Sequence, residues 1–99
     1  MPIQWYTFHM LDKNKNPVAS AHADIVFNYR KEGWHGQREH RTSARVRNGM
    51  GELTVPPFSE DEEVVSVKIT VTQDDRRHSV TAGSSTVVSG SGPTIRLPW

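Results

Sequence analysis

Apolar and polar residues alternate with a period of two along this chain, and this pattern restricts it to β-rich folds. In the segment 64–73, one face of a predicted strand carries Val65, Val67, Ile69 and Val71. No segment shows a convincing repeat of about 3.6 residues, which is the spacing of an amphipathic helix. Short strands separated by turn signals roughly every 8–12 residues are typical of a β-sandwich or a small barrel.

Two more strands flank a turn near the start of the chain. Residues 3–11 carry apolar side chains on both faces, which suits a strand inside a sandwich. Residues 21–29 predict a half-buried strand, since their odd-numbered positions are all apolar or aromatic. Between them, Asp12 suits a turn because its side chain can bond nearby backbone, and Pro17 cannot donate within a ladder. The two strands either pair as a hairpin or belong to different sheets.

The middle and end of the chain are more polar. Residues 30–42 predict a long loop with an irregular strand near its end. Asn48-Gly49 predicts a type I′ hairpin, with residues 52–56 as the returning strand. The acidic run 59–63 could form one helical turn with Ser59 as its N-cap. Further short strands are predicted at 78–81, 86–88 and 94–97, with a mobile Ser/Gly-rich linker in the region 82–92.

Length and composition narrow the function classes. Ninety-nine residues predict one domain, 1–99. The chain has no cysteine, which excludes disulfides and thiol chemistry. The sequence shows no signal peptide and no apolar run long enough for a membrane span, so we expect a cytoplasmic protein, with leaderless secretion left open. The net charge of +1 gives no overall attraction to nucleic acid or membranes.

The pattern Leu11-Asp12-x-x-x-Asn16-Pro17-Val18-x-x-Ala21, followed by an alternating strand, resembles the first hairpin of transthyretin-like and carboxypeptidase-regulatory-like domains. The segment 51-GELTVP-56 is similar to a later step in those domains, with Leu53 in place of an aromatic residue. The resemblance implies an all-β, prealbumin-like fold, a seven- to eight-stranded antiparallel β-sandwich with at most one short helical turn. It also implies a binding or structural module, of the kind found in bacterial surface or secretion machinery.

One enzyme branch of that family, the hydroxyisourate hydrolases, carries a catalytic His in a His-x-Leu-Asp motif near the N-terminus. This chain has His9-Met10-Leu11-Asp12 at the matching place. The branch ends in Tyr-Arg-Gly-Ser, whereas this chain ends in 93-PTIRLPW-99, and only Arg47 and His78 are candidates for the other groups. A hydrolytic site needs a base and groups that hold and polarise the substrate. We therefore assign no catalytic residue and keep a hydrolase that uses His9 as the alternative.

Basic residues mix with aromatic ones in 34-WHGQREHRTSARVR-47, where Trp34 could stack on a base. This segment is the basis for a further alternative, a nucleic-acid or carbohydrate binder through residues 30–47. The acidic run 60-EDEE-63 and the small net charge favour a protein partner over nucleic acid. The candidate binding residues, including a C-terminal tryptophan expected to be free to dock, are Trp34, His35, Arg38, Arg41, Arg45, Arg47 and Trp99.

The histidines show no spacing that is typical of a metal site, and we expect no metal, no cofactor and no membrane partner. The five are His9, His22, His35, His40 and His78. Loops on a rigid sandwich often carry binding, so we expect contacts through residues 30–42 and 82–93. An unpaired sheet edge would also offer a route to a partner strand or to a homodimer.

Overall fold

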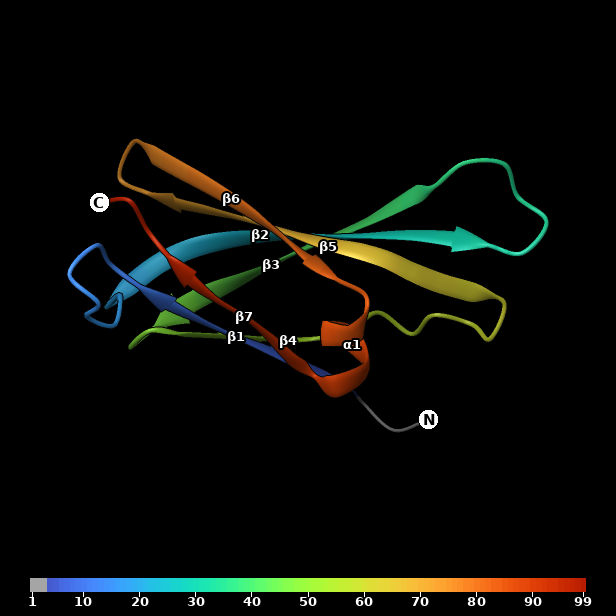
Figure 1. Ribbon diagram of the computed structural model, residues 1–99, viewed down its shortest axis with the longest axis horizontal. Helices are drawn as coiled ribbons and strands as arrows, with labels where there is room; N and C mark the ends of the chain where they lie inside the picture. Colours follow the sequence, from blue (N-terminus) through green and yellow to red (C-terminus); the bar gives the residue numbers. More distant parts are fainter. Residues whose placement is uncertain (1–3) are drawn as a thin grey trace.

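The chain forms seven strands and one short helix (Figure 1). The computed structural model describes residues 4–99. The fold class predicted from the sequence, all-β with seven to eight strands and at most one short helical turn, is confirmed. No helix among the described residues is long and apolar enough to span a membrane. The elements are β1 (Trp5–Leu11), β2 (Ser20–Lys31), β3 (Arg38–Arg47), β4 (Met50–Thr54), β5 (Glu62–Gln73), β6 (Arg76–Gly83), α1 (Ser85–Ser89) and β7 (Ser91–Arg96).

The strands follow the order β6-β5-β2-β3-β4-β1-β7 in one sheet that folds over on itself. The fold occurs between β3 and β4, which are joined only by the pair Arg47–Met50. As a result, β6-β5-β2-β3 forms one layer and β4-β1-β7 the other, and β1 and β2 lie in different layers rather than in one hairpin. The sheet is mixed rather than purely antiparallel, because the chain crosses over through α1 and places β7 parallel to β1.

The core lies between the two layers. From β1, the side chains of Tyr6, Phe8 and Met10 are fully buried, whereas Trp5 and His9 point outward. They face Ile25 and Phe27 of β2, and the rings of Tyr6 and Phe27 meet edge to face with centroids 6.1 Å apart. Alternation along β1 and most of β2 therefore selects which face of these strands becomes the core.

The predicted apolar face of β5 is correct for its C-terminal part. Val67, Ile69 and Val71 are fully buried. Val65 is only partly buried, and Val64 packs against the core instead. The pairing of β5 with β2 shifts register between Asn28 and Tyr29, and such a shift moves the neighbouring side chains to the opposite face.

Three local predictions need correction. In the segment 30–42, the loop is shorter than predicted, because β2 continues to Lys31 and only residues 32–37 connect it to β3. The strand predicted near the end of this segment is present, since β3 begins at Arg38. The segment 59–63, predicted as a helical turn, is instead a turn that leads into β5. The helical turn is α1, which replaces the strand predicted at 86–88 and part of the linker predicted at 82–92. Helix α1 ends at Gly90, whose φ of 76° is left-handed, as is common at a helix C-terminus.

The predicted turns are confirmed in detail. Asn48 and Gly49 have φ values of 51° and 78°, as a type I′ hairpin requires. A Cβ at position 49 would lie only 2.7 Å from Cβ of Pro17, so glycine is needed for space as well as for conformation. In the first turn, Oδ1 of Asp12 accepts hydrogen bonds from the N–H groups of Asn14 (2.8 Å) and Asn16 (3.0 Å).

A substitution at Gly51 would show how tightly the core is packed around Phe8. It pairs with Phe8, and a Cβ at this position would lie 2.2 Å from Cζ of that buried ring. We expect Gly51→Ala to lower the free energy of unfolding by about 1–3 kcal/mol, because the aromatic ring must move in a close-packed core. Urea denaturation followed by tryptophan fluorescence measures the change.

The matched control is Gly83→Ala on β6. A Cβ there would have only Ser85 Oγ near it, at 4.0 Å. This variant should stay within about 0.5 kcal/mol of the wild type. Equal losses in the two variants would contradict the close contact of Phe8 with Gly51.

Candidate binding cleft

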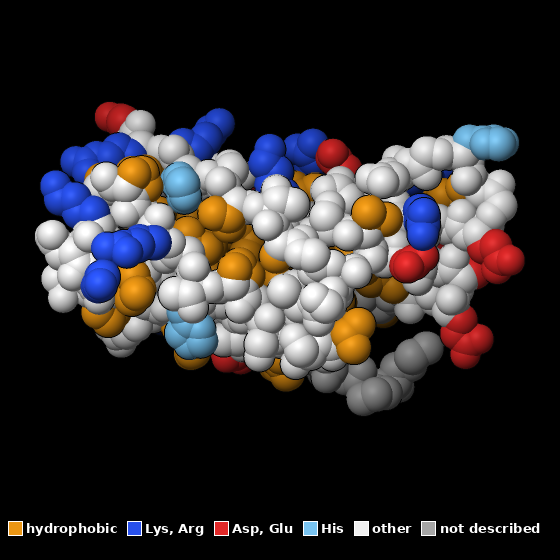
Figure 2. Space-filling model, in the orientation of Figure 1, with side chains coloured by type: hydrophobic (Ala, Val, Ile, Leu, Met, Phe, Trp, Pro, Cys, Tyr) orange, Lys and Arg blue, Asp and Glu red, His pale blue; other side chains and the backbone are white. Residues whose placement is uncertain are grey.

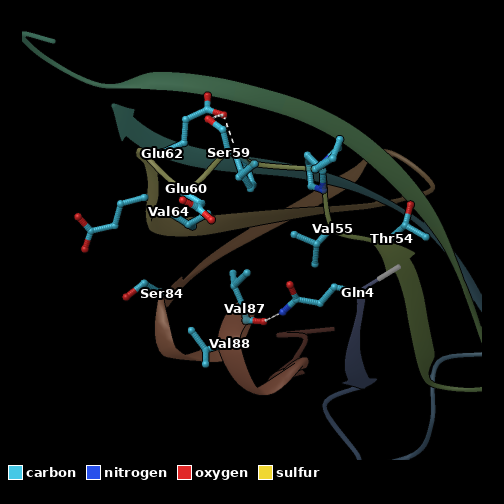
Figure 3. A pocket seen from close by; sticks show the side chains of 14 residues that line it. Gln4, Thr54, Val55, Ser59, Glu60, Glu62, Val64, Ser84, Val87 and Val88 are labelled. Atoms are coloured by element: carbon cyan, nitrogen blue, oxygen red, sulfur yellow. Dashed lines mark hydrogen bonds between the residues drawn. The ribbon is translucent and has the colours of Figure 1, made fainter. Parts of the chain in front are cut away.

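A cleft of about 820 Å³ opens at one end of the sandwich, where the segment 54–64 passes α1 (Figure 3). Its apolar walls are formed by Val55, Pro56, Pro57, Phe58, Val64, Val87 and Val88. Its polar positions are Gln4, Thr54, Ser59, Glu60, Glu62, Glu63 and Ser84. Among the described residues that line it, three are carboxylates and none is Lys, Arg or His.

Phe58 positions the long connection that forms one wall. Two prolines precede it and end the pairing after β4, since proline cannot donate to a ladder. The ring of Phe58 then packs against Tyr29 with centroids 5.0 Å apart and against Phe27 at 6.1 Å. This aromatic contact holds the connection against β2 and leaves the space between the connection and α1 open.

Helix α1 forms the opposite wall and is held by side chains of β1 and of Gln4, the residue before this strand. The hydroxyl groups of Tyr6 and Thr86 are 2.9 Å apart, and burial raises the pKa of Tyr6 above its usual value. The side-chain amide of Gln4 donates to the carbonyl oxygen of Val87. Val87 is buried, whereas Val88 is 84% exposed at the mouth of the cleft. A large aliphatic side chain in this position is available to a partner.

The acidic rim is organised by Ser59. Its N–H donates to Oε1 of Glu62 at 2.8 Å, and its hydroxyl lies 2.7 Å from the same oxygen and 2.6 Å from Oδ1 of Asp61. Hydrogen bonds to the charged form lower the pKa values of Asp61 and Glu62 below their usual range. Both groups therefore keep their negative charge into mildly acidic solution.

The predicted basic segment does not form one patch. At the tip of the β2–β3 hairpin, the Arg38 guanidinium lies 3.8 Å from the Trp34 ring centroid, and His35 is exposed in the same turn. Further along β3, Arg41 pairs with Glu39 at 2.8 Å. Arg45 and Arg47 lie towards the other end of the strand. None of these residues lines the cleft.

Trp99 is docked, so the expectation that it is free was wrong. Its indole N–H donates to Oε1 of Gln73 at 2.8 Å, and its carbonyl oxygen accepts from the N–H of Lys13 at 3.0 Å. The ring packs against the core and meets His78 edge to face. The last residue thus connects β5, β6 and the first turn.

Charges are unevenly distributed between the two ends of the molecule. On the face drawn in Figure 2, Lys and Arg side chains are dense at one end, and several Asp and Glu side chains lie at the other end, beside a basic side chain. Several cations meet at the basic end. The N–H of Lys13 bonds to the carbonyl oxygen of Trp99, and the Arg76 guanidinium lies 5.8 Å from the Trp99 ring centroid. Arg96 pairs with Leu11 at the ends of β7 and β1, and Arg47 ends β3 nearby. The carboxylates of the segment 60–63 lie at the acidic end, beside the cleft.

The hydrolase candidates are not gathered at a cleft. His9 is exposed on the outer face of β1, between Met50 of β4 and Thr94 of β7, and does not line the cleft. Arg47 is two strands away, beyond Met50. His78 lies on β6 against Trp99. Of the remaining histidines, His22 contacts Asp24 at 3.0 Å, and no group of three potential metal ligands is found within residues 4–99.

The cleft was not predicted from the sequence. Its lining residues come from three separate stretches, at position 4, in 54–64 and in 84–88. The available local signal was 56-PPFSEDEE-63, in which a rigid apolar pair and an aromatic residue precede a run of carboxylates. That run was interpreted as a helix start instead of a cleft rim.

The role of Ser59 can be tested by titration. We expect Ser59→Ala to raise the pKa values of Asp61 and Glu62 towards their ordinary values, because the hydroxyl donor is lost. Since these pKa values are depressed in the folded state, the stabilisation is present above the unfolded-state pKa values and is lost as the pH falls through the folded-state values. Carboxyl ¹³C NMR titration gives each pKa directly.

Ser84→Ala is the control, because Ser84 lines the same cleft and its side chain makes no hydrogen bond to a carboxylate among residues 4–99. This variant should leave both pKa values unchanged. Unchanged values in Ser59→Ala would show that the serine does not organise the rim.

Comparison with known proteins gives no relative: no protein-family model, no curated protein and no solved structure matches this chain.

Proposed function

We propose that this chain is a non-enzymatic protein-binding module whose cleft holds an apolar side chain from a partner segment that also carries Lys or Arg. The observation that carries the proposal is the combination of apolar walls with a rim of carboxylates and no lining cation. Partner binding sites commonly combine an apolar centre with a polar rim.

The apolar walls and the carboxylate rim of the cleft would contribute different amounts to the binding free energy. Burial of one Leu or Phe side chain against Val55, Val64 and Val87 would contribute about 1.5–3 kcal/mol. Each exposed ion pair at the rim would add about 0–1 kcal/mol. The apolar anchor therefore supplies most of the affinity. The carboxylates favour basic segments over acidic ones and speed their approach.

The same charges argue against a phosphate backbone as the partner. Carboxylates at the cleft repel phosphates, and two cations near the end of β2 already have acidic partners. Arg30 is 3.1 Å from Glu63, and Lys31 is 3.6 Å from Asp61. Trp34, the expected stacking platform, is 38% exposed, and the side chains of Arg38 and Lys31 lie against its ring. These contacts favour the protein-binding proposal over the nucleic-acid or carbohydrate alternative.

We also propose that the fold is related to the transthyretin-like sandwiches that the sequence resembles. Two layers built from seven strands support this relation. The first turn supports it as well, since Asp12 closes the turn through two backbone N–H groups and Pro17 leads into β2. The relation concerns the fold, and the function is argued from the cleft.

Two short peptides test the proposed function. We expect the acetylated peptide Lys-Leu-Phe-Leu-Lys to shift the NMR signals of cleft residues such as Val55, Val64 and Val88. The matched peptide Glu-Leu-Phe-Leu-Glu should produce much smaller shifts, because its charges face Glu60 and Glu62. Equal binding of both peptides, shifts centred elsewhere, or no shift at millimolar peptide would contradict the proposal.

A charge reversal then locates the contact. Glu60 forms no ion pair among residues 4–99, so Glu60→Lys changes the rim without breaking an internal contact. We expect it to weaken binding of the lysine peptide about 3- to 10-fold. Glu52→Lys, on the outer face of β4, is the control and should have no effect.

A further inference from the structure

The outer edge of β3 has no neighbouring strand over most of its length. On one side, β2 pairs with every residue from Arg38 to Arg47. On the other side, β4 pairs only at Arg47 and then diverges. No backbone hydrogen bond from residues 38–45 to any other described segment occupies this side. An unpaired edge of this kind is a template for another strand.

The backbone groups that face this free edge can be identified. Beyond the end of β3, the N–H of Asn48 bonds to the carbonyl oxygen of Ala19, next to the start of β2. Backbone groups alternate sides along a strand, so the even-numbered residues of β3 bond to β2. Glu39, Arg41 and Ser43 therefore direct their N–H and C=O groups outward, and all three residues are exposed.

We propose that a second copy of this chain adds to this edge, with the two β3 strands antiparallel about a two-fold axis at His40. In this register, Glu39 of each copy lies directly opposite Arg41 of the other. The contact is isologous, because the same short segment serves on both sides. The cleft adjoins this edge through Phe58, whose ring meets His40 with centroids 6.3 Å apart, but no residue of β3 lines it.

Charge selects this register. An axis at Arg41 would place two arginines opposite each other, and an axis at Glu39 would oppose two glutamates, which is unfavourable across strands. An axis at Thr42 would bring the second copy alongside Val46 and Arg47, where Arg47 already pairs with Met50. The axis at His40 keeps the contact within residues 37–43, short of β4.

The side chains that would pair are available. Glu39 is 50% exposed and Arg41 is 76% exposed, and each currently contacts the other within the same strand at 2.8 Å. In the dimer, each would exchange this partner for an equivalent one on the second copy. Charged side chains on an edge strand otherwise discourage indiscriminate pairing, so the edge accepts a charge-matched strand and rejects most others.

Charge swaps test the proposal. Sedimentation and light scattering over micromolar to millimolar concentrations should show the wild type approach twice the chain mass. Glu39→Arg and Arg41→Glu should each weaken association at least tenfold, because like charges then face each other. The double variant E39R/R41E should restore it, since the pairs are re-formed with the signs exchanged. Arg77→Glu, on β6, is the control and should leave association unchanged.

Amide hydrogen exchange gives an independent readout that does not depend on any variant. The N–H groups of Glu39, Arg41 and Ser43 should be protected only at concentrations where the dimer forms. Those of His40 and Thr42, which bond to β2, should be protected at all concentrations. A wild type that stays monomeric throughout, or a double variant that fails to recover, would overturn the proposal.

Discussion

The packing of β1 against β2, centred on the contact of Tyr6 with Phe27, holds this molecule together. The two layers share a single backbone pair where the sheet folds, at Arg47–Met50. Side-chain burial, rather than a hydrogen-bonded ladder, must therefore keep them face to face. The free edge of β3 and the open end that forms the cleft both lie away from this backbone connection.

Much of the fold could be predicted from the sequence, because strand alternation and turn chemistry are local. The buried positions of β1 and β2 and the Asn48-Gly49 hairpin are examples. The outer half of the β2–β3 hairpin could not be predicted in this way. Both its faces are largely exposed, so polar residues replace the alternation that marks a strand. Likewise, the β-branched Val87 and Val88 suggest a strand, but their tertiary setting places them in a helix.

The candidate site was harder to predict, because it joins residues far apart in the chain. Gln4, Val64 and Val87 meet only after the layers pack. The sequence showed the basic and acidic runs but could not show that Arg30 pairs with Glu63, which removes a cation from the expected binding segment. Trp99 was misjudged for the same reason, since its partner Gln73 is on β5. Pairing across strands depends on register, which a single sequence specifies weakly.

The excess of Lys and Arg at one end and the carboxylates of the segment 60–63 at the other give the molecule an uneven charge distribution, although its net charge is only +1. The molecule is 45 Å along its longest axis, several times the Debye length of about 8 Å at physiological salt. At low salt, the field of a charged partner exerts a torque that rotates the whole molecule before contact. At higher salt this torque is screened, whereas the free energy gained by burying an apolar side chain does not depend on charge and remains. Ionic strength thus governs how the molecule is oriented on approach, and the apolar walls govern how long a bound segment remains.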